Sequence, residues 1–320
     1  MWYLFKMTSK ARIFRSAKRD FFCRKIDSQE TVQATALAAL LKEDHIVVGD
    51  FVELDQDNTI VSVHPRQNSI FRNIPREQKK KVIASNVDVM LIVMSAGKPA
   101  FKRGLIDRYL ARADYWEVPA YVIFNKMDQY DESEFDIRFE ADRLKWLNVK
   151  TFELSAEHPS YKPRYLESGI KELEIALKDK TAVLLGHSGV GKSRLITTLS
   201  NGKVELLSGE LGKVGKGAHT TTWAELIDAD QFTLIDSPGI RSMSLSDLTK
   251  QDLLYCFSDV NEWTTKCQFS SNCTHEKNSK GCFFQALNEN EREDQLILSR
   301  LDSYKRILEE VSNIPDWLKK

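Results

Sequence analysis

An eight-residue loop constrains the fold of this chain more than any other stretch, because it matches the phosphate-binding pattern G-x-x-x-x-G-K-[ST] at every fixed position. The apolar run 181–185 precedes the loop, and the segment 194–199, which can continue as a helix, follows it. A strand, a glycine-rich loop and a helix in this order are typical of a nucleotide-binding α/β domain. The loop reads Gly186-His187-Ser188-Gly189-Val190-Gly191-Lys192-Ser193.

The residue types in this loop indicate how it would hold phosphate. The glycines allow successive N–H groups to point at phosphate oxygens, and the N-terminus of the following helix adds its positive end. Lys192 is predicted to reach the β- and γ-phosphates, and the hydroxyl of Ser193 is predicted to ligate Mg²⁺. A chance glycine-rich turn is the alternative, and the flanking strand and helix argue against it.

A second motif, N-K-x-D, follows an apolar strand and predicts the base. The carboxylate of Asp128 can accept both N1–H and N2–H of guanine, a pairing that adenine does not offer. Asn125 is expected to tie the loop, and the stem of Lys126 is expected to lie along the ring plane. After the next strand, Ser155 and Ala156 stand where a backbone N–H would contact guanine O6. The motif reads Asn125-Lys126-Met127-Asp128.

Two further motifs predict the elements that sense the γ-phosphate. The run Asp236-Ser237-Pro238-Gly239 fits D-x-x-G, in which Asp236 would meet Mg²⁺ through water and the Gly239 N–H would meet the γ-phosphate. Upstream, a glycine-rich stretch contains His219-Thr220-Thr221-Thr222. One of these three threonines, with Thr221 as our choice, is predicted to be the Mg²⁺-sensing switch residue.

The motifs stand in an unusual order, because the base-binding elements precede the phosphate loop. This order predicts a circularly permuted GTPase domain over residues 82–246, whose sheet can still close if the original termini lie near one another. Alternating strand and helix patterns in this region predict a doubly wound parallel sheet of six strands. Their ranges are 87–94, 120–124, 149–154, 181–185, 223–227 and 232–235.

Residues 1–75 read as short β segments and predict an OB-like barrel, although the segment 36–41 favours a helix. A basic linker is expected at 76–81. The first 25 residues combine many basic side chains with phenylalanines, which leaves two interpretations open: an RNA-binding surface, or a solvated strand face with core phenylalanines. The basic residues are Lys6, Lys10, Arg12, Arg15, Lys18, Arg19, Arg24 and Lys25.

Residues 247–320 are expected to form a helical zinc-binding domain. Three cysteines and one histidine follow the spacing C-x5-C-x-H-x6-C, which fills a tetrahedral Zn²⁺ and predicts one structural ion. Buried cysteines beside a surface histidine are the alternative, but the polar, turn-rich surroundings offer no core. An amphipathic helix near 291–311 is expected to pack on this module. The ligands are Cys267, Cys273, His275 and Cys282.

The composition excludes several classes of protein. Lys+Arg and Asp+Glu are both 46, so net charge alone makes no case for nucleic acid. No apolar run approaches the length of a membrane span, and the apolar start of the chain is too short for a signal-peptide core. A cytoplasmic protein without a membrane partner is the simplest expectation.

These motifs and their order resemble the circularly permuted RsgA/YjeQ family, the ribosome small-subunit-dependent GTPases. The resemblance covers nearly the whole chain, from the OB-like region to the C-terminal Cys/Cys/His/Cys site. It implies a monomer that binds the small ribosomal subunit late in maturation and uses Mg²⁺ with GTP or GDP. It also implies that the barrel and the zinc domain grip rRNA, which makes the basic N-terminal cluster an rRNA-facing surface.

The residue after the D-x-x-G motif predicts slow hydrolysis by the free protein. Ile240 follows Gly239, where many GTPases carry a glutamine that positions water, and isoleucine cannot orient water. We therefore expect stimulation by the small subunit, with His219 as the candidate polar group. The rival hypotheses are an ATP-dependent P-loop enzyme such as a kinase, and a non-catalytic RNA-binding scaffold with a structural nucleotide.

Overall fold

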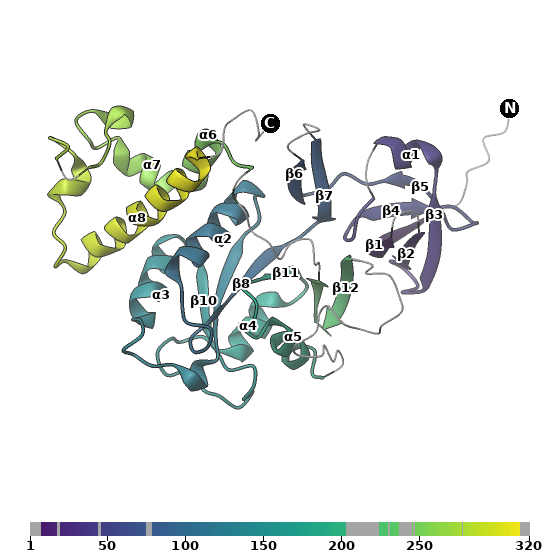
Figure 1. Cartoon of the computed structure of the whole chain (residues 1–320). Coiled ribbons are helices and arrows are strands. Elements are labelled where there is room, and N and C mark those ends of the chain that lie inside the picture. Colours follow the sequence, from purple (N-terminus) through teal and green to yellow (C-terminus); the bar gives the residue numbers. More distant parts are fainter. Residues whose placement is uncertain are drawn as a thin grey trace.

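The computed structural model describes residues 8–17, 20–43, 46–74, 79–202, 224–229, 231–236, 245, 247–276 and 278–313. A small barrel, a central α/β unit and a C-terminal helical unit follow one another along the chain (Figure 1). Over these residues no helix is both long and apolar enough to span a membrane.

The N-terminal strands close into a five-stranded barrel in the order β1-β2-β3-β5-β4, with β4 pairing back to β1. β3 and β5 are parallel, and the other neighbouring strands are antiparallel. The expected OB-like barrel is thus confirmed, and so is the helix near 36–41, which is α1 between β3 and β4. The elements are β1 Ser9–Ala17, β2 Asp20–Lys25, β3 Thr31–Ala36, α1 Ala38–Glu43, β4 Phe51–Leu54 and β5 Thr59–Val63.

A separate two-stranded hairpin leads from the barrel to the α/β unit. β6 Ser69–Ile74 pairs antiparallel with β7 Lys79–Ser85. Within the segment 76–81, which was expected to be a linker, residues 79–81 form the start of β7 and pair with residues 72–74 of β6. The basic side chains Lys80 and Lys81 are therefore exposed on a strand.

The α/β unit contains the six expected strands in the order β10-β9-β8-β11-β13-β12. Its first five strands are parallel, whereas β12 runs antiparallel to β13, so the expectation of a wholly parallel sheet is wrong at this edge. Only residues 230 and 231 separate the two strands, too few for a parallel crossover. The strands are β8 Val89–Ser95, β9 Ala120–Asn125, β10 Lys150–Glu153, β11 Thr181–Leu185, β12 Ala224–Ala229 and β13 Phe232–Asp236.

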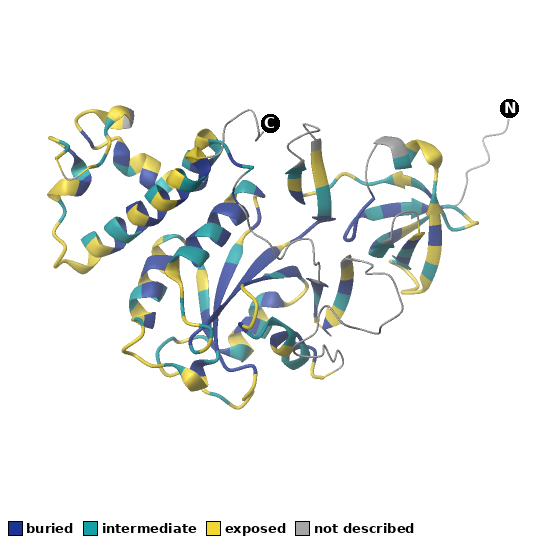
Figure 2. Ribbon diagram, in the orientation of Figure 1, coloured by how far each residue is buried: buried dark blue, intermediate teal, exposed yellow. Residues whose placement is uncertain are grey.

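Helices cover both faces of this sheet. α2 Arg103–Tyr115 and α3 Ile137–Trp146 contribute to one apolar cluster, and α4 Ile170–Leu177 and α5 Lys192–Leu199 contribute to a second. β8 divides its side chains between the two clusters and is buried along its whole length (Figure 2). This burial on both faces explains its near-continuous apolar sequence.

The barrel and the α/β sheet share hydrogen bonds, because β1 pairs antiparallel with β12. The register places Arg15 opposite Glu225 and Ser16 opposite Ala224. β12 therefore has a strand on each side, β13 on one and β1 on the other. A continuous sheet of eleven strands connects the two units.

The C-terminal unit consists of α6 Lys250–Cys256, α7 Ser258–Thr264 and α8 Arg292–Ser312. Buried and exposed residues alternate along α8 (Figure 2), and its buried residues join a cluster that includes Cys267 and Cys282. The expected packing of this helix on the cysteine-rich module is therefore present.

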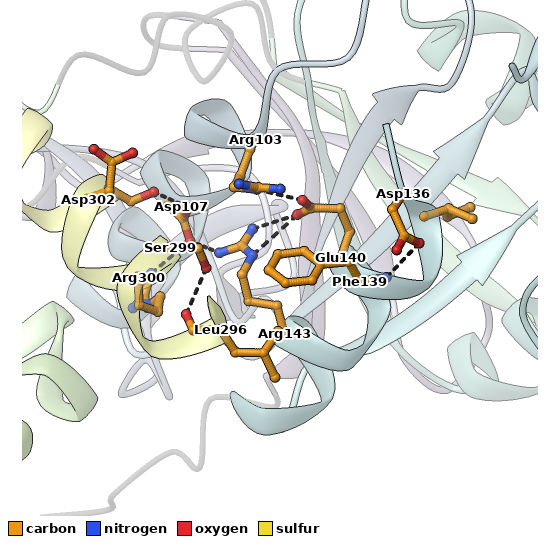
Figure 3. Close-up of polar contacts among 12 residues, drawn as sticks. Arg103, Asp107, Asp136, Phe139, Glu140, Arg143, Leu296, Ser299, Arg300 and Asp302 are labelled. Atoms are coloured by element: carbon orange, nitrogen blue, oxygen red, sulfur yellow. Dashed lines mark hydrogen bonds and ion pairs between the residues drawn. The ribbon is translucent and has the colours of Figure 1, made fainter. Parts of the chain in front are cut away.

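A buried ionic network also fixes α8 to the α/β unit (Figure 3). Asp107 of α2 is 0% exposed and accepts hydrogen bonds from Arg143 of α3 at 2.5 Å and Arg300 of α8 at 2.8 Å. Ser303 donates to its second oxygen at 2.6 Å. Burial opposes ionisation of Asp107, but the two guanidinium groups outweigh it and hold the pKa of this carboxyl below its ordinary value.

Candidate nucleotide site and metal centre

The phosphate loop lies between β11 and α5, as the sequence predicts. β11 is a central strand, paired with β8 on one side and β13 on the other, so the loop starts from a rigid position. Gly186 and Gly191 have φ values of +148° and +95°. A Cβ atom added at Gly186 would lie 2.4 Å from Val93 O, and a Cβ atom added at Gly191 would lie 2.4 Å from Asn125 Nδ2. Both positions therefore require glycine.

Lys192 folds over its own loop. Its Nζ donates to the carbonyl oxygens of Gly186 at 2.7 Å and His187 at 2.8 Å. Lys192 and Ser193 are the first two residues of α5, so their side chains stand at the positive end of a helix. An anion in the loop would thus meet the ammonium group, the hydroxyl group and the helix N-terminus together.

Asn125 links the phosphate loop to the second predicted base-binding loop. Its Nδ2 donates to Val190 O at 2.9 Å, and its Oδ1 accepts from the Ala156 N–H, also at 2.9 Å. Asn125 is 1% exposed, so these are buried hydrogen bonds. The Ala156 N–H would have to leave Asn125 before it could meet guanine O6. Ser155 is also buried, and its hydroxyl accepts from the His158 N–H at 3.2 Å.

The remaining residues of the N-K-x-D motif lie on a short turn after β9. Lys126 has a φ of +64°, and its Nζ donates to Gly189 O at 2.6 Å and to Lys98 O at 2.5 Å. Met127 is buried and anchors the turn, which presents Asp128. His158 Nε2 lies 3.8 Å from Asp128 Oδ2. Lys98 and His158 could not be identified from the sequence, because neither belongs to a motif.

The γ-phosphate elements are only partly within the described residues. Asp236 ends β13, whose preceding residue Ile235 pairs with Val183 of β11. The two strand ends therefore meet at the edge of the sheet that carries the phosphate loop. The predicted residues His219, Thr220, Thr221, Thr222 and Gly239 lie outside the described residues.

The four predicted metal ligands converge in space. The ligand atoms of Cys267, Cys273, His275 and Cys282 all lie within 4.8 Å of one another. His275 Nδ1 is 3.7 Å from Cys267 Sγ and 3.6 Å from Cys282 Sγ, and the two sulfur atoms are 4.0 Å apart. A tetrahedral Zn²⁺ with bonds of about 2.3 Å to sulfur requires ligand separations of about 3.8 Å. The donor set therefore fits one four-coordinate zinc ion.

The surroundings of this cluster are arranged to hold its ligands. The Phe283 N–H donates to Cys267 Sγ at 3.4 Å, and Lys305 of α8 donates to His275 O at 2.7 Å. Burial raises the pKa of Cys267 to about 11, so a metal ion has to displace the proton of this thiol. The cluster and α8 thus form one structural unit.

Part of the basic N-terminal cluster faces the α/β unit. Arg12 Nη2 donates to Thr181 Oγ1 at 2.8 Å, and Arg24 forms an ion pair with Asp228. Burial lowers the pKa of the Arg12 guanidinium. Lys10 Nζ lies 5.2 Å from the centre of the Phe51 ring. Arg12 and Arg24 contribute to the junction between the two units.

A family model described as "RsgA GTPase" matches residues 63–246, and one described as "50S ribosome-binding GTPase" matches residues 181–313. The chain belongs to the RsgA GTPase family. Curated relatives named "Small ribosomal subunit biogenesis GTPase RsgA" agree with this assignment. The relative from Flavobacterium psychrophilum is 30% identical to this chain, and the aligned region covers 82% of this chain and 80% of the relative. The relative from Bacteroides fragilis is 31% identical, covering 86% of each chain.

Solved structures agree on the fold. The crystal structure of YjeQ from Thermotoga maritima has a TM-score of 0.73 at 24% identity and covers 96% of this chain and 99% of its own. YloQ, described as a circularly permuted GTPase, has a TM-score of 0.69 at 22% identity, with 98% of both chains covered. The circularly permuted architecture expected from the motif order is thus confirmed for this RsgA GTPase.

Proposed function

We propose that this RsgA GTPase hydrolyses GTP to GDP and phosphate and assists late maturation of the small ribosomal subunit, which stimulates its turnover. The observation that carries the proposal is Asn125, which joins the phosphate loop and the Ser155–Ala156 loop through two buried hydrogen bonds. The names of the relatives, "Small ribosomal subunit biogenesis GTPase RsgA", support the partner.

In this proposal each motif residue has one task. Asp128 selects guanine, Lys192 binds the β- and γ-phosphates, and Ser193 holds Mg²⁺. The bound Mg²⁺ supplies positive charge to the phosphate oxygens. Asp236, Gly239 and Thr221 would respond to the γ-phosphate, and His219 would contribute to the stimulated reaction.

The three structural units would divide the work. We assign residues 1–75 and 247–320 to rRNA contacts, residues 76–81 to the connection and residues 82–246 to GTP. The Cys267, Cys273, His275 and Cys282 cluster would hold one structural Zn²⁺, which leaves no open position for catalysis. We further propose a monomer that acts in the cytoplasm.

GTP hydrolysis with and without purified small subunits tests the proposal. We expect slow turnover alone and a marked increase with subunits. Lys192→Ala should abolish both, whereas Arg194→Ala, which removes an exposed side chain from the same helix, should change neither. Equal turnover with and without subunits would contradict the proposed stimulation, and absence of any turnover would favour the scaffold hypothesis. Unchanged stimulation in His219→Ala would remove His219 from the mechanism.

The identity of the base is tested separately. Asp128→Ala removes two hydrogen bonds to a charged acceptor, so the affinity for GDP should fall by about 100-fold. Titration with GDP and ADP measures this effect. An unmodified protein that binds ADP as tightly as GDP would favour the rival ATP-dependent enzyme.

A further inference from the structure

A groove of about 1100 Å³ follows the outer edge of the α/β sheet, where β10 lies between α3 and α4. Lys150 begins β10 and Lys180 precedes β11, so the groove includes the N-terminal ends of these strands. The phosphate loop follows the C-terminal end of β11, on the opposite side of the sheet. The groove is therefore distinct from the nucleotide site.

Positive charge dominates the described lining of this groove, which contains six Lys or Arg side chains and three carboxylates. Asp142 lies 2.7 Å from Arg292 and neutralises it in part. Lys145 and Lys178, by contrast, are exposed and form no ion pair within the part of the chain that the structure describes. The six cations are Arg138, Lys145, Lys150, Lys178, Lys180 and Arg292.

Two tryptophans lie in contact at the end of α3, close to the groove-lining residues Asp142 and Lys145, and only Trp146 of the two is exposed. Trp146 follows Lys145 directly and is 50% exposed. Its ring centre lies 6.0 Å from that of Trp263 on α7, and the rings are inclined by 43°. A second hollow of about 200 Å³ lies against both indoles and Leu296 of α8. Flat apolar surface is thus available beside the cationic groove.

The combination identifies a class of ligand. An edge strand can pair with a strand of another protein, but the lysine at the start of β10 disfavours such pairing. Cations on α3, at the start of β10, just after α4 and at the start of α8 match the repeated phosphates of a polymer better than one small anion. An exposed indole such as that of Trp146 can stack on a base of any sequence. We propose that this groove binds single-stranded RNA, with phosphates along the cations and a base on Trp146.

This inference rests on the proposed function only in that an immature small subunit would supply the RNA strand. It adds a contact on the GTPase unit, at the end of the sheet farthest from the barrel, to the barrel and helical-unit contacts that the family resemblance already assigns to rRNA. RNA bound there would touch α3, the helix that holds Arg143 against Asp107.

Binding of a fluorescent oligouridine to the full-length protein tests the cations. Replacing both Lys145 and Lys178 by Ala should weaken binding about tenfold at physiological salt. It should also reduce the slope of the logarithm of the binding constant against the logarithm of the salt concentration by about 1.4. The matched control replaces Lys171 and Lys250, exposed lysines outside the groove lining, and should leave both values unchanged. Equal behaviour of the two double variants would overturn the proposal.

The stacking contact has its own test. Trp146→Ala should weaken oligouridine binding about tenfold, and Trp146→Phe should restore most of it, because phenylalanine retains a ring for stacking. Ultraviolet cross-linking should attach the oligouridine to the peptide that spans residues 138–150. Equal affinities of the Ala and Phe variants, or cross-links confined to the barrel and the helical unit, would overturn the assignment.

Two controls separate this inference from the proposed function. GDP affinity should be unchanged in every groove variant, which shows that the nucleotide site is folded. If small subunits do not stimulate the unmodified protein, the proposed function is contradicted. If the groove variants bind oligouridine as tightly as the unmodified protein does, only the proposal of RNA binding in the groove is contradicted. A glutamate-rich peptide that displaces oligouridine from the groove at lower concentration than RNA itself would overturn RNA as the ligand.

Discussion

Asp50 and Asp107 are both 0% exposed, and both accept hydrogen bonds from arginine, Asp50 where the barrel meets the hairpin and Asp107 where the helical unit meets the α/β unit. Asp50 belongs to the barrel, and its partner is Arg66, whose side chain is 15% exposed. Asp107 holds Arg143 and Arg300, whose side chains are 1% and 3% exposed. Water can therefore reach the arginine that pairs with Asp50, whereas it has almost no access to the two arginines that pair with Asp107.

The two networks also differ in the length of chain that they connect. Asp50 bonds to Ser85, 35 residues away, within the barrel and the hairpin that follows it. Asp107 bonds to Arg300, 193 residues away, and so joins the α/β unit to the last helix. The comparison teaches that the helical unit depends on distant buried charges, whereas the barrel joins the α/β unit through the shared sheet and the partly exposed contacts of Arg12 and Arg24.

The largest difference should appear when metal ligation is lost, because only the helical junction includes a metal cluster among the described residues. Cys282→Ser should release the metal ion and unfold the helical unit, since structural zinc contributes on the order of 10 kcal/mol. Metal content and limited proteolysis measure this. Cys256→Ala, a buried cysteine outside the cluster, should retain the metal. A Cys282→Ser protein with one bound metal would contradict the assignment.

The next effect is expected at Asp107. Asp107→Ala removes the carboxylate that two buried guanidinium groups share and leaves Arg143 with Glu140 and Arg300 with Asp259, which should lower the free energy of unfolding by about 3 kcal/mol. Urea denaturation measures the change. Asp302→Ala removes an exposed carboxylate of α8 that pairs with Arg306, and it should cost at most about 0.5 kcal/mol. Similar values for the two variants would show that the buried network does not hold the junction.

Asp50→Ala should cost less, about 2 kcal/mol, because water can solvate Arg66 after the carboxylate is removed. The same urea experiment compares it with Asp107→Ala. A loss at Asp50 equal to or larger than the loss at Asp107 would reverse the comparison.

Acid should weaken the helical junction. The folded pKa of Asp107 is below its ordinary value of about 3.9, so its contribution to stability is complete above that pH. The contribution is lost as the pH falls through the folded pKa, by about 1.4 kcal/mol per pH unit. Stability measured below about pH 4 should fall less steeply in Asp107→Asn than in the unmodified protein. Identical acid curves would contradict this role.

The smallest effect is expected at the rim of the barrel junction. Asp228→Asn removes the charge that pairs with Arg24, and the two side chains are 51% and 32% exposed. Exposed ion pairs contribute about 0–1 kcal/mol, and salt screens them. Urea denaturation at low and high salt should show a change within this range that disappears at high salt. A larger, salt-independent loss would indicate a buried role for Asp228.

The sequence predicts the backbone of the phosphate loop well, because a short motif specifies it. The strand and helix that flank the loop and the glycines at 186 and 191 follow from backbone requirements within a few residues. The direction of β12 could not be predicted, since an apolar pattern reports burial and carries no information on strand polarity.

The long-range charge networks also could not be predicted from the sequence. Asp107, Arg143 and Arg300 are each a charged residue on an amphipathic helix, where exposure to solvent is the usual expectation. Their burial follows from the packing of three helices that lie far apart in the chain. The sequence likewise indicates an RNA-binding surface at Arg12 and Arg24, whereas in the fold these side chains contact Thr181 and Asp228.

The pairing of β1 with β12 has a consequence for truncated forms of this protein. Removing the barrel would leave β12 as the outermost strand, with unpaired backbone N–H and C=O groups near residues 224 and 225. Exposed strand edges of this kind recruit strands from other molecules. A fragment that begins after the barrel should therefore self-associate, and its poor solubility would reflect the missing neighbour strand and not a misfolded GTPase unit.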